Sequence, residues 1–95
     1  MRKYEIMYIL KANLEEAVRQ ETMDGLHAII TSHEGTIENV NEWRLKEFAY
    51  EIDYEKKGYY VVINITANNE GIAEFDRLAR INNNVVRFLI VKEEA

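Results

Sequence analysis

The chain has no cysteine among its 95 residues. A disulfide framework and thiolate chemistry are therefore excluded. Glycine is also scarce, and the four glycines, at positions 25, 35, 58 and 71, form neither a G-x-G-x-x-G sequence nor a P-loop. Because such glycine-rich turns let a backbone cradle phosphate groups, we expect no nucleotide site of that kind and no cofactor.

Long hydrophobic runs are absent as well. No stretch reaches the roughly 18 apolar residues of a membrane-spanning helix, so no membrane segment is expected. The first residues lack the basic, then apolar, then small-residue order of a secretory signal. A length of 95 residues predicts a single domain, residues 1–95, with a modest core. These features together favour a cytoplasmic protein.

Residues suited to catalysis or metal binding are few. His27 and His33 both fall near the end of the first predicted helix, and neither has a partner ligand at a metal-binding spacing. We interpret both as structural or solvated. Glu93 and Glu94 are interpreted as a polar tail. No catalytic residue, metal site or small-molecule substrate is therefore predicted, and the chain is not expected to be an enzyme.

The formal net charge of −5 argues against a nucleic-acid binder that depends on bulk positive charge. The charges are unevenly distributed, however. Acidic residues concentrate in helical segments, while basic residues recur at the start of the chain, in the hairpin and near the end. The basic residues outside the first helix include Arg2, Lys3, Arg44, Lys46, Lys56, Lys57, Arg77, Arg80, Arg87 and Lys92. This separation allows a local basic patch on an acidic protein.

A long β-hairpin is the most prominent pattern in the sequence. Its arms, residues 43–52 and 59–65, are rich in aromatic and β-branched residues. The polar connection, residues 53–58, ends at Gly58, where a positive φ would cost little. Apolar positions within residues 36–52 switch parity, which predicts a bulge or strong twist.

Hydrophobic periodicity predicts the other elements. We expect strands at residues 4–10 and 85–91 and helices at residues 14–32 and 70–81. In the first helix, Asn13 is the expected N-cap, Gly25 is expected to permit close packing on the sheet, and Gly35 is expected to end the helix. The expected core stripe of this helix, with Thr22 and Met23 at its margins, is Val18, Leu26, Ile29 and Ile30.

The element order is therefore β-α-β-β-α-β. Two right-handed crossovers joined by a hairpin predict an α+β, ferredoxin-like split β-α-β sandwich, with a four-stranded antiparallel sheet and both helices on one face. The other face is open and too apolar for an ordinary solvated surface, so we expect a partner to cover part of it. The residues expected on this open face are Glu5, Met7, Ile9, Tyr60, Val62, Asn64, Arg87 and Leu89.

The aromatic hairpin allows two interpretations. Its aromatic side chains are either core and edge residues of a small sheet, or partly exposed groups that meet RNA or protein. The RNA-recognition motif itself is disfavoured, because residues 58–62 lack its preceding basic residue and its Gly-Phe core.

Two other functions fit the same topology. One is a small homodimeric enzyme with an apolar cavity between two sheets and His27 or His33 as base. The other is a regulatory module that binds an amino acid or nucleotide at a strand–helix loop, against which the scarcity of glycine counts.

Five segments, in order along essentially the whole chain, resemble bacterial ribosomal protein six of the small subunit. They are residues 1–9, 42–43 with 48–52, 58–60, 75–81 and 86–91. The resemblance implies the β-α-β-β-α-β fold and a non-catalytic structural role on the cytoplasmic ribosome. It further implies pairing with ribosomal protein eighteen of the small subunit and binding to the central domain of small-subunit ribosomal RNA.

The sequence departs from this family at residues 43–50. Family members typically carry a Trp-Gly-Lys-Arg-Arg/Lys-Leu-Ala-Tyr run, whereas here Arg44 replaces the glycine and Glu47 occupies a usually basic position. Lys46 alone matches the basic pair directly.

Site residues follow from this resemblance and from the open face. We expect phosphate contacts, which position the protein and do not read sequence, from Arg2, Arg44, Lys46, Arg80, Arg87 and Lys92. We expect partner contacts through the sheet from Tyr4, Met7, Tyr60, Val62 and Leu89. For Arg87 an alternative is a structural pair with Glu5 on a neighbouring strand.

Overall fold

The computed structural model of the chain describes residues 1–52 and 55–93, and the side chains of all of these except residues 43–52 and 55–57. The elements run in the predicted order β-α-β-β-α-β. They are β1 (Arg2–Lys11), α1 (Glu16–Ser32), β2 (Thr36–Ile52), β3 (Glu55–Ala67), α2 (Asn69–Ile81) and β4 (Val85–Lys92).

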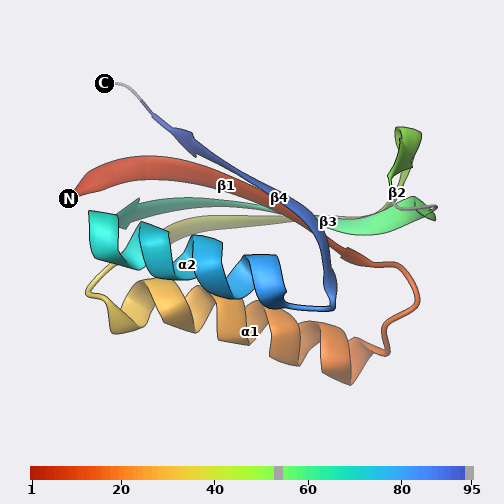
Figure 1. Ribbon diagram of the computed structural model, residues 1–95, viewed down its shortest axis with the longest axis horizontal. Coiled ribbons are helices and arrows are strands. Elements are labelled where there is room, and N and C mark those ends of the chain that lie inside the picture. Colours follow the sequence, from red (N-terminus) through yellow and green to blue (C-terminus); the bar gives the residue numbers. More distant parts are fainter. Residues whose placement is uncertain (53–54, 94–95) are drawn as a thin grey trace.

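The four strands form one antiparallel sheet in the order β2-β3-β1-β4. Both helices lie against the same face of this sheet, and the start of β1 and the end of β4 lie at the same end of the sheet (Figure 1). This is the predicted two-layer sandwich, with one face of the sheet left open.

The core lies between the sheet and the helices. Alternate residues of β1, namely Tyr4, Ile6, Tyr8 and Leu10, are buried, as expected for one face of a strand. They stand opposite Ile65, Ile63, Val61 and Tyr59 of β3, in that order. The helices complete the buried cluster with Met23, Leu26, Ile30, Phe75 and Ala79.

The start of α1 differs from the prediction. The helix begins at Glu16 with Glu15 as its N-cap, so Asn13 is not the cap. Glu15 has an extended backbone and no side-chain capping bond. Leu14 packs partly buried against the core cluster, which it reaches from this extended segment. Tertiary packing therefore overrides the local preference of Asn13 for the cap.

The buried stripe of α1 is also shifted. Thr22, Met23, Leu26 and Ile30 are buried, whereas Val18 is 38% exposed. Gly25 lies on the outer side of the helix, and a Cβ added there would meet nothing within 4 Å. The prediction that Gly25 permits close packing on the sheet is therefore wrong.

The end of α1 lies where Gly35 predicted it, for a different reason. His33 is the C-cap, and the positive φ of 65° belongs to Glu34. A Cβ on Gly35 would lie 2.7 Å from Cγ2 of Ile30 and 2.9 Å from the carbonyl oxygen of Thr66. Gly35 is therefore needed because the chain passes close to both α1 and β3 here.

The β2–β3 hairpin is longer than predicted. Strand β3 begins at Glu55, so Gly58 lies within it, buried and without the positive φ expected of a turn residue. The described pairing continues to Ile52 opposite Glu55, and residues 53–54 of the expected turn lie outside the described residues. The predicted irregularity of β2 is confirmed by register shifts at Ile37/Asn39, Glu42/Arg44 and Glu47/Ile52.

Helix α2 begins at a side-chain cap. The Asn68 side chain accepts a hydrogen bond of 2.7 Å from the backbone N–H of Gly71, and its amide donates to the carbonyl of His33 at 3.2 Å. One residue therefore caps α2 and ties it to the end of α1.

Candidate nucleic-acid and protein interface

The register of the sheet arranges the open face in cross-strand rows. Residues directly opposite in neighbouring antiparallel strands share a face of the sheet. A central row runs Asn41, Val62, Met7 and Leu89 from β2 to β4. The next row runs Arg44, Tyr60, Ile9 and Arg87, and the row beyond it contains Lys46, Gly58 and Lys11.

These two outer rows bring three predicted phosphate-binding residues to neighbouring register positions. Arg44 and Arg87 occupy the two ends of one row, and Lys46 lies in the next. Lys11 joins them, although sequence reasoning missed it because the first strand was expected to end at residue 10. The alternation of residues 5, 7 and 9 onto the open face, continued by one step, would have found it.

The other predicted cations lie elsewhere. Arg2 is opposite Ala67, and Lys92 is opposite Tyr4, so both occupy the far end of the sheet. Arg80 lies on α2, where its guanidinium donates to Asp76 at 2.8 Å and stacks over the Phe88 ring. The six predicted residues therefore occupy three separate places.

The alternative interpretation of Arg87 is wrong. Arg87 is opposite Ile9, whereas Glu5 is opposite Val91, so two register steps separate Arg87 from Glu5. The side chain of Glu5 is instead near Asn64, whose amide donates to it at 3.4 Å.

Among the predicted partner-binding residues, Tyr4 does not lie on the open face. It is 8% exposed and belongs to the core cluster with Ile6 and Tyr8, because even-numbered residues of β1 face the helices. Met7, Val62 and Leu89 share the central row and Tyr60 lies in the next one, as the open-face prediction requires.

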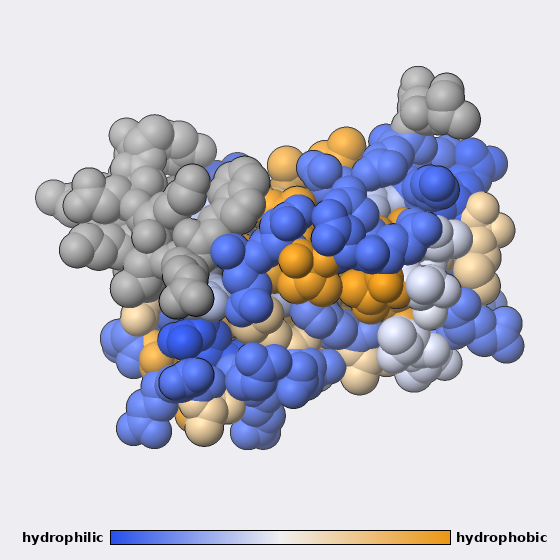
Figure 2. Space-filling view, turned by 180° about the vertical axis from the view of Figure 1, so that it is seen from behind, coloured by the Kyte–Doolittle hydropathy of each residue, from blue (hydrophilic) through white to orange (hydrophobic). Residues whose placement is uncertain are grey.

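Part of the open face is buried. Ile9 is only 2% exposed and Val62 only 8%, whereas Leu89 is 53% exposed. Among the residues whose side chains are described, the exposed apolar surface of this face is therefore concentrated on β4. Figure 2, seen from behind the view of Figure 1, shows a small group of hydrophobic residues near the centre with polar residues around it.

The sheet end that holds Arg2 and Lys92 also carries acidic groups. The Asn64 amide donates to Glu93 at 3.0 Å, in addition to its contact with Glu5. The open face thus has a cationic end near Lys11 and Arg87 and an acidic cluster at Glu5 and Glu93. An anionic ligand is favoured at the first and disfavoured at the second.

Each of the two histidines makes a structural hydrogen bond. The Tyr8 hydroxyl and His27 Nε2 form a hydrogen bond of 2.7 Å between β1 and α1. Burial lowers the pKa of His27, against the opposing charges of Asp24 and Glu42, and burial raises the pKa of Tyr8. His33 Nδ1–H donates to the Ile29 carbonyl at 2.8 Å, within its own helix.

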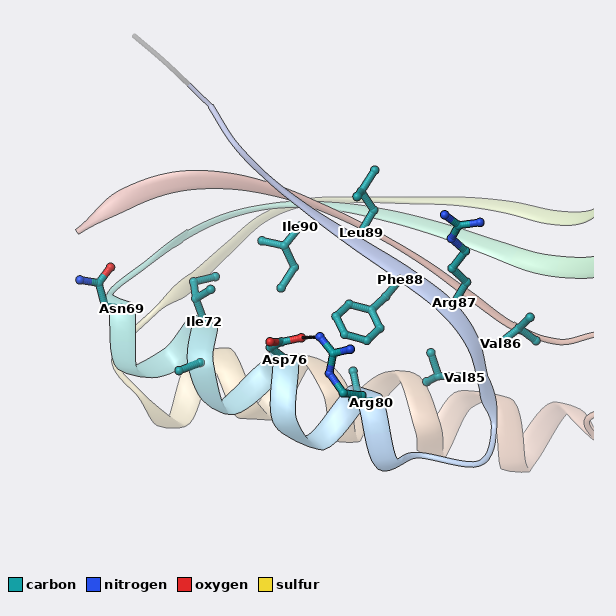
Figure 3. A pocket seen from close by; sticks show the side chains of 12 residues that line it. Asn69, Ile72, Asp76, Arg80, Val85, Val86, Arg87, Phe88, Leu89 and Ile90 are labelled. Atoms are coloured by element: carbon teal, nitrogen blue, oxygen red, sulfur yellow. Dashed lines mark hydrogen bonds and ion pairs between the residues drawn. The ribbon is translucent and has the colours of Figure 1, made fainter. Parts of the chain in front are cut away.

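No group of three metal-ligating side chains occurs in the described part of the chain. Among the described residues there is also no helix long and apolar enough to cross a membrane. An open groove of about 600 Å³ lies between α2 and β4, lined by Ile72, Asp76, Arg80, Val85 and Phe88 among others (Figure 3).

Comparison with known proteins supports the family resemblance. The family model described as ribosomal protein S6 matches residues 3–92. The chain is 48% identical over 94 residues to the small ribosomal subunit protein bS6 of Halalkalibacterium halodurans, covering 99% of each chain. The crystal structure of 30S ribosomal protein S6 from Thermotoga maritima has a TM-score of 0.91 at 27% identity, covering 97% of this chain and 87% of that one.

The five resembling segments therefore identified the family correctly, and the predicted absence of enzymatic activity is confirmed by it. The fold, the rows of the open face and these matches lead to one conclusion. The chain belongs to the ribosomal protein S6 family and is a non-enzymatic structural constituent of the small subunit of the cytoplasmic ribosome.

Proposed function

We propose that the chain binds the central domain of small-subunit ribosomal RNA together with ribosomal protein eighteen of the small subunit, through the open face of its sheet. The observation that carries this proposal is the pair of neighbouring rows that contain Arg44, Lys46, Lys11 and Arg87. Four cationic residues in two adjacent cross-strand rows, on a chain of net charge −5, make a local site for phosphates.

The acidic cluster at the far end fixes the orientation of the RNA. Glu5 and Glu93 share the Asn64 amide there, and their carboxylates repel phosphate. The RNA backbone is therefore expected to cross the sheet near Lys11 and Arg87 and to leave the Glu5 end uncovered. Arg2 and Lys92, which are opposite Ala67 and Tyr4 on the helix side of that end of the sheet, would serve a second contact only.

Arg80 is expected to contribute less to RNA binding than the residues of the two cationic rows. Its guanidinium already neutralises Asp76 and packs over Phe88, so a phosphate would have to compete with a carboxylate at 2.8 Å. Because Arg80 also lies on α2, outside the two cationic rows, we expect its replacement to weaken RNA binding only slightly.

The protein partner is assigned to the apolar part of the same face. Met7 and Leu89 in the central row, with Tyr60 in the next row, offer side chains that pack against a partner, and Val62 lies beside Met7 on β3. A partner that is basic would also complement the net charge of −5 and supply further phosphate contacts.

The test is the affinity for central-domain ribosomal RNA with ribosomal protein eighteen present, measured over a range of salt concentrations. Each lost phosphate contact should reduce the slope of log affinity against log salt by about 0.7 to 0.9. Lys46→Glu and Arg87→Glu should each reduce affinity and slope, and the double variant should reduce both further.

The matched control is Arg77→Glu, which makes the same charge change on the outer side of α2, where Arg77 pairs with Glu74. It should leave the slope unchanged. Equal effects of Arg87→Glu and Arg77→Glu would mean that net charge, and not this site, governs binding. An unchanged slope in the double variant would contradict the proposed RNA site.

A further inference from the structure

The outer edge of β4 has the features of a strand that pairs with another chain. β4 ends the sheet order, and among residues 1–52 and 55–93 no strand pairs with its outer side. Most of its side chains are apolar, and Arg87 and Lys92 are its two charged residues; on the open side Leu89 is 53% and Val91 46% exposed. Figure 3 shows Leu89 pointing away from α2 and Phe88 pointing toward it.

The direction of the β4 backbone groups follows from one hydrogen bond. The N–H of Glu93 donates to the carbonyl of Lys3 on β1 at 2.9 Å. Because backbone groups alternate in direction along a strand, residues 87, 89 and 91 also point toward β1. Phe88, Ile90 and Lys92 therefore direct their N–H and C=O groups outward, and such an edge is a template for an added strand.

We propose that two copies of this chain pair through β4, antiparallel about a twofold axis at Ile90, to form one continuous sheet. In this register Ile90 is opposite Ile90 of the second copy, and Phe88 is opposite Lys92 of the second copy. All three are outward-pointing residues, so each opposed pair exchanges two backbone hydrogen bonds.

Charge complementarity selects this register and this partner. On the open side, this register places Leu89 opposite Val91 of the second copy, and Arg87 opposite Glu93 of the second copy. Both ends of the pairing therefore join a cation to a carboxylate, while the two most exposed apolar residues of the strand cover each other.

Neighbouring registers lose these matches. A shift of two residues in one direction places Arg87 opposite Val91 of the second copy and Leu89 opposite Leu89 of the second copy. A shift of two residues in the other direction places Leu89 opposite Glu93 of the second copy. The backbone bonds are the same in all three registers, so the side chains of the open face decide among them.

The α2 side of the edge accommodates the second strand. The groove of about 600 Å³ between α2 and β4 is lined by Ile72, Phe88 and Ile90, and Ile90 of the second copy would lie at its mouth. A single strand pair buries less surface than a standard stable interface, so the dimer is expected to be weak, with a Kd on the order of 100 µM.

The test is sedimentation of the full chain over protein concentrations from micromolar to millimolar. The mean mass should rise from 11.2 kDa toward twice that value. Arg87→Glu and Glu93→Arg should each weaken the dimer about tenfold, since each creates two like-charge contacts, and the double variant should restore it. Arg77→Glu, an equal charge change on α2, should have no effect.

Amide hydrogen exchange provides a second readout that needs no variant. Raising the concentration should slow exchange at Phe88, Ile90 and Lys92 and leave Leu89 and Val91, already directed to β1, unchanged. A monomer at millimolar concentration would overturn the proposal. So would a dimer that the double variant does not restore, or slowed exchange at these amides only when another ribosomal protein is added.

Discussion

The hydroxyl of Tyr8 lies 2.7 Å from Nε2 of His27, and this contact joins the central strand β1 to α1 across the core. The ring of His27 also meets the ring of Tyr8 edge-on, with centroids 5.9 Å apart. Beside them the Tyr59 hydroxyl donates to Glu42 at 2.9 Å, and the Arg19 guanidinium stacks over the Tyr59 ring at 4.3 Å. The titratable side chain of His27 is therefore part of the contact between the helices and the sheet.

Stability should fall at mildly acidic pH because of His27. Burial lowers its pKa in the folded chain, whereas the unfolded chain binds a proton near the ordinary pKa of about 6.5. The unfolded state therefore binds more protons below that pH, and the free energy of unfolding decreases as the pH falls through and below it.

The measurement is urea unfolding of the wild type and of His27→Gln at pH 7.5 and 5.5. His27→Gln should be less stable at pH 7.5, because its side chain does not reproduce the ring contact with Tyr8. It should lose less stability between the two pH values than the wild type. An equal loss in both proteins would show that other groups cause the pH dependence.

Gly25→Ala should stabilise the chain. Gly25 lies on the exposed side of α1, and an added Cβ meets nothing within 4 Å. Alanine reduces the conformational entropy of the unfolded chain and favours the helix, so the gain is expected to be about 0.4 to 1 kcal/mol. Urea unfolding measures it, and a loss of stability would mean that this face of α1 is covered.

Gly35→Ala should have the opposite effect. The added Cβ would lie 2.7 Å from Cγ2 of Ile30 and 2.8 Å from its carbonyl oxygen, and Ile30 is fully buried. Either α1 or β3 must shift, so we expect a loss of about 1 to 3 kcal/mol. The same urea experiment with Gly25→Ala as matched control measures it, and a neutral result would mean that the end of α1 relaxes easily.

The sequence predicted those features that depend on local periodicity. The alternation of Tyr59, Val61, Ile63 and Ile65 was enough to assign both faces of β3, because each face has a different environment.

The features that depend on long-range pairing were not predictable in the same way. The pairing of Arg87 with Glu5 failed because the register between β1 and β4, which no local pattern marks, places Arg87 opposite Ile9 and Glu5 opposite Val91. Gly58 was predicted to lie in a turn because glycine after a run of polar residues is typical of turns. It pairs instead with Lys46 on one side and Lys11 on the other, which keeps it in the strand.

The direct test of the proposed interface is the map of backbone amide chemical-shift changes across the chain when ribosomal protein eighteen and central-domain ribosomal RNA are added. Shifted signals at Met7, Lys11, Tyr60 and Arg87, with the outer surfaces of α1 and α2 unaffected, are the predicted result. Shifts confined to the helices, with these four residues unchanged, would contradict it.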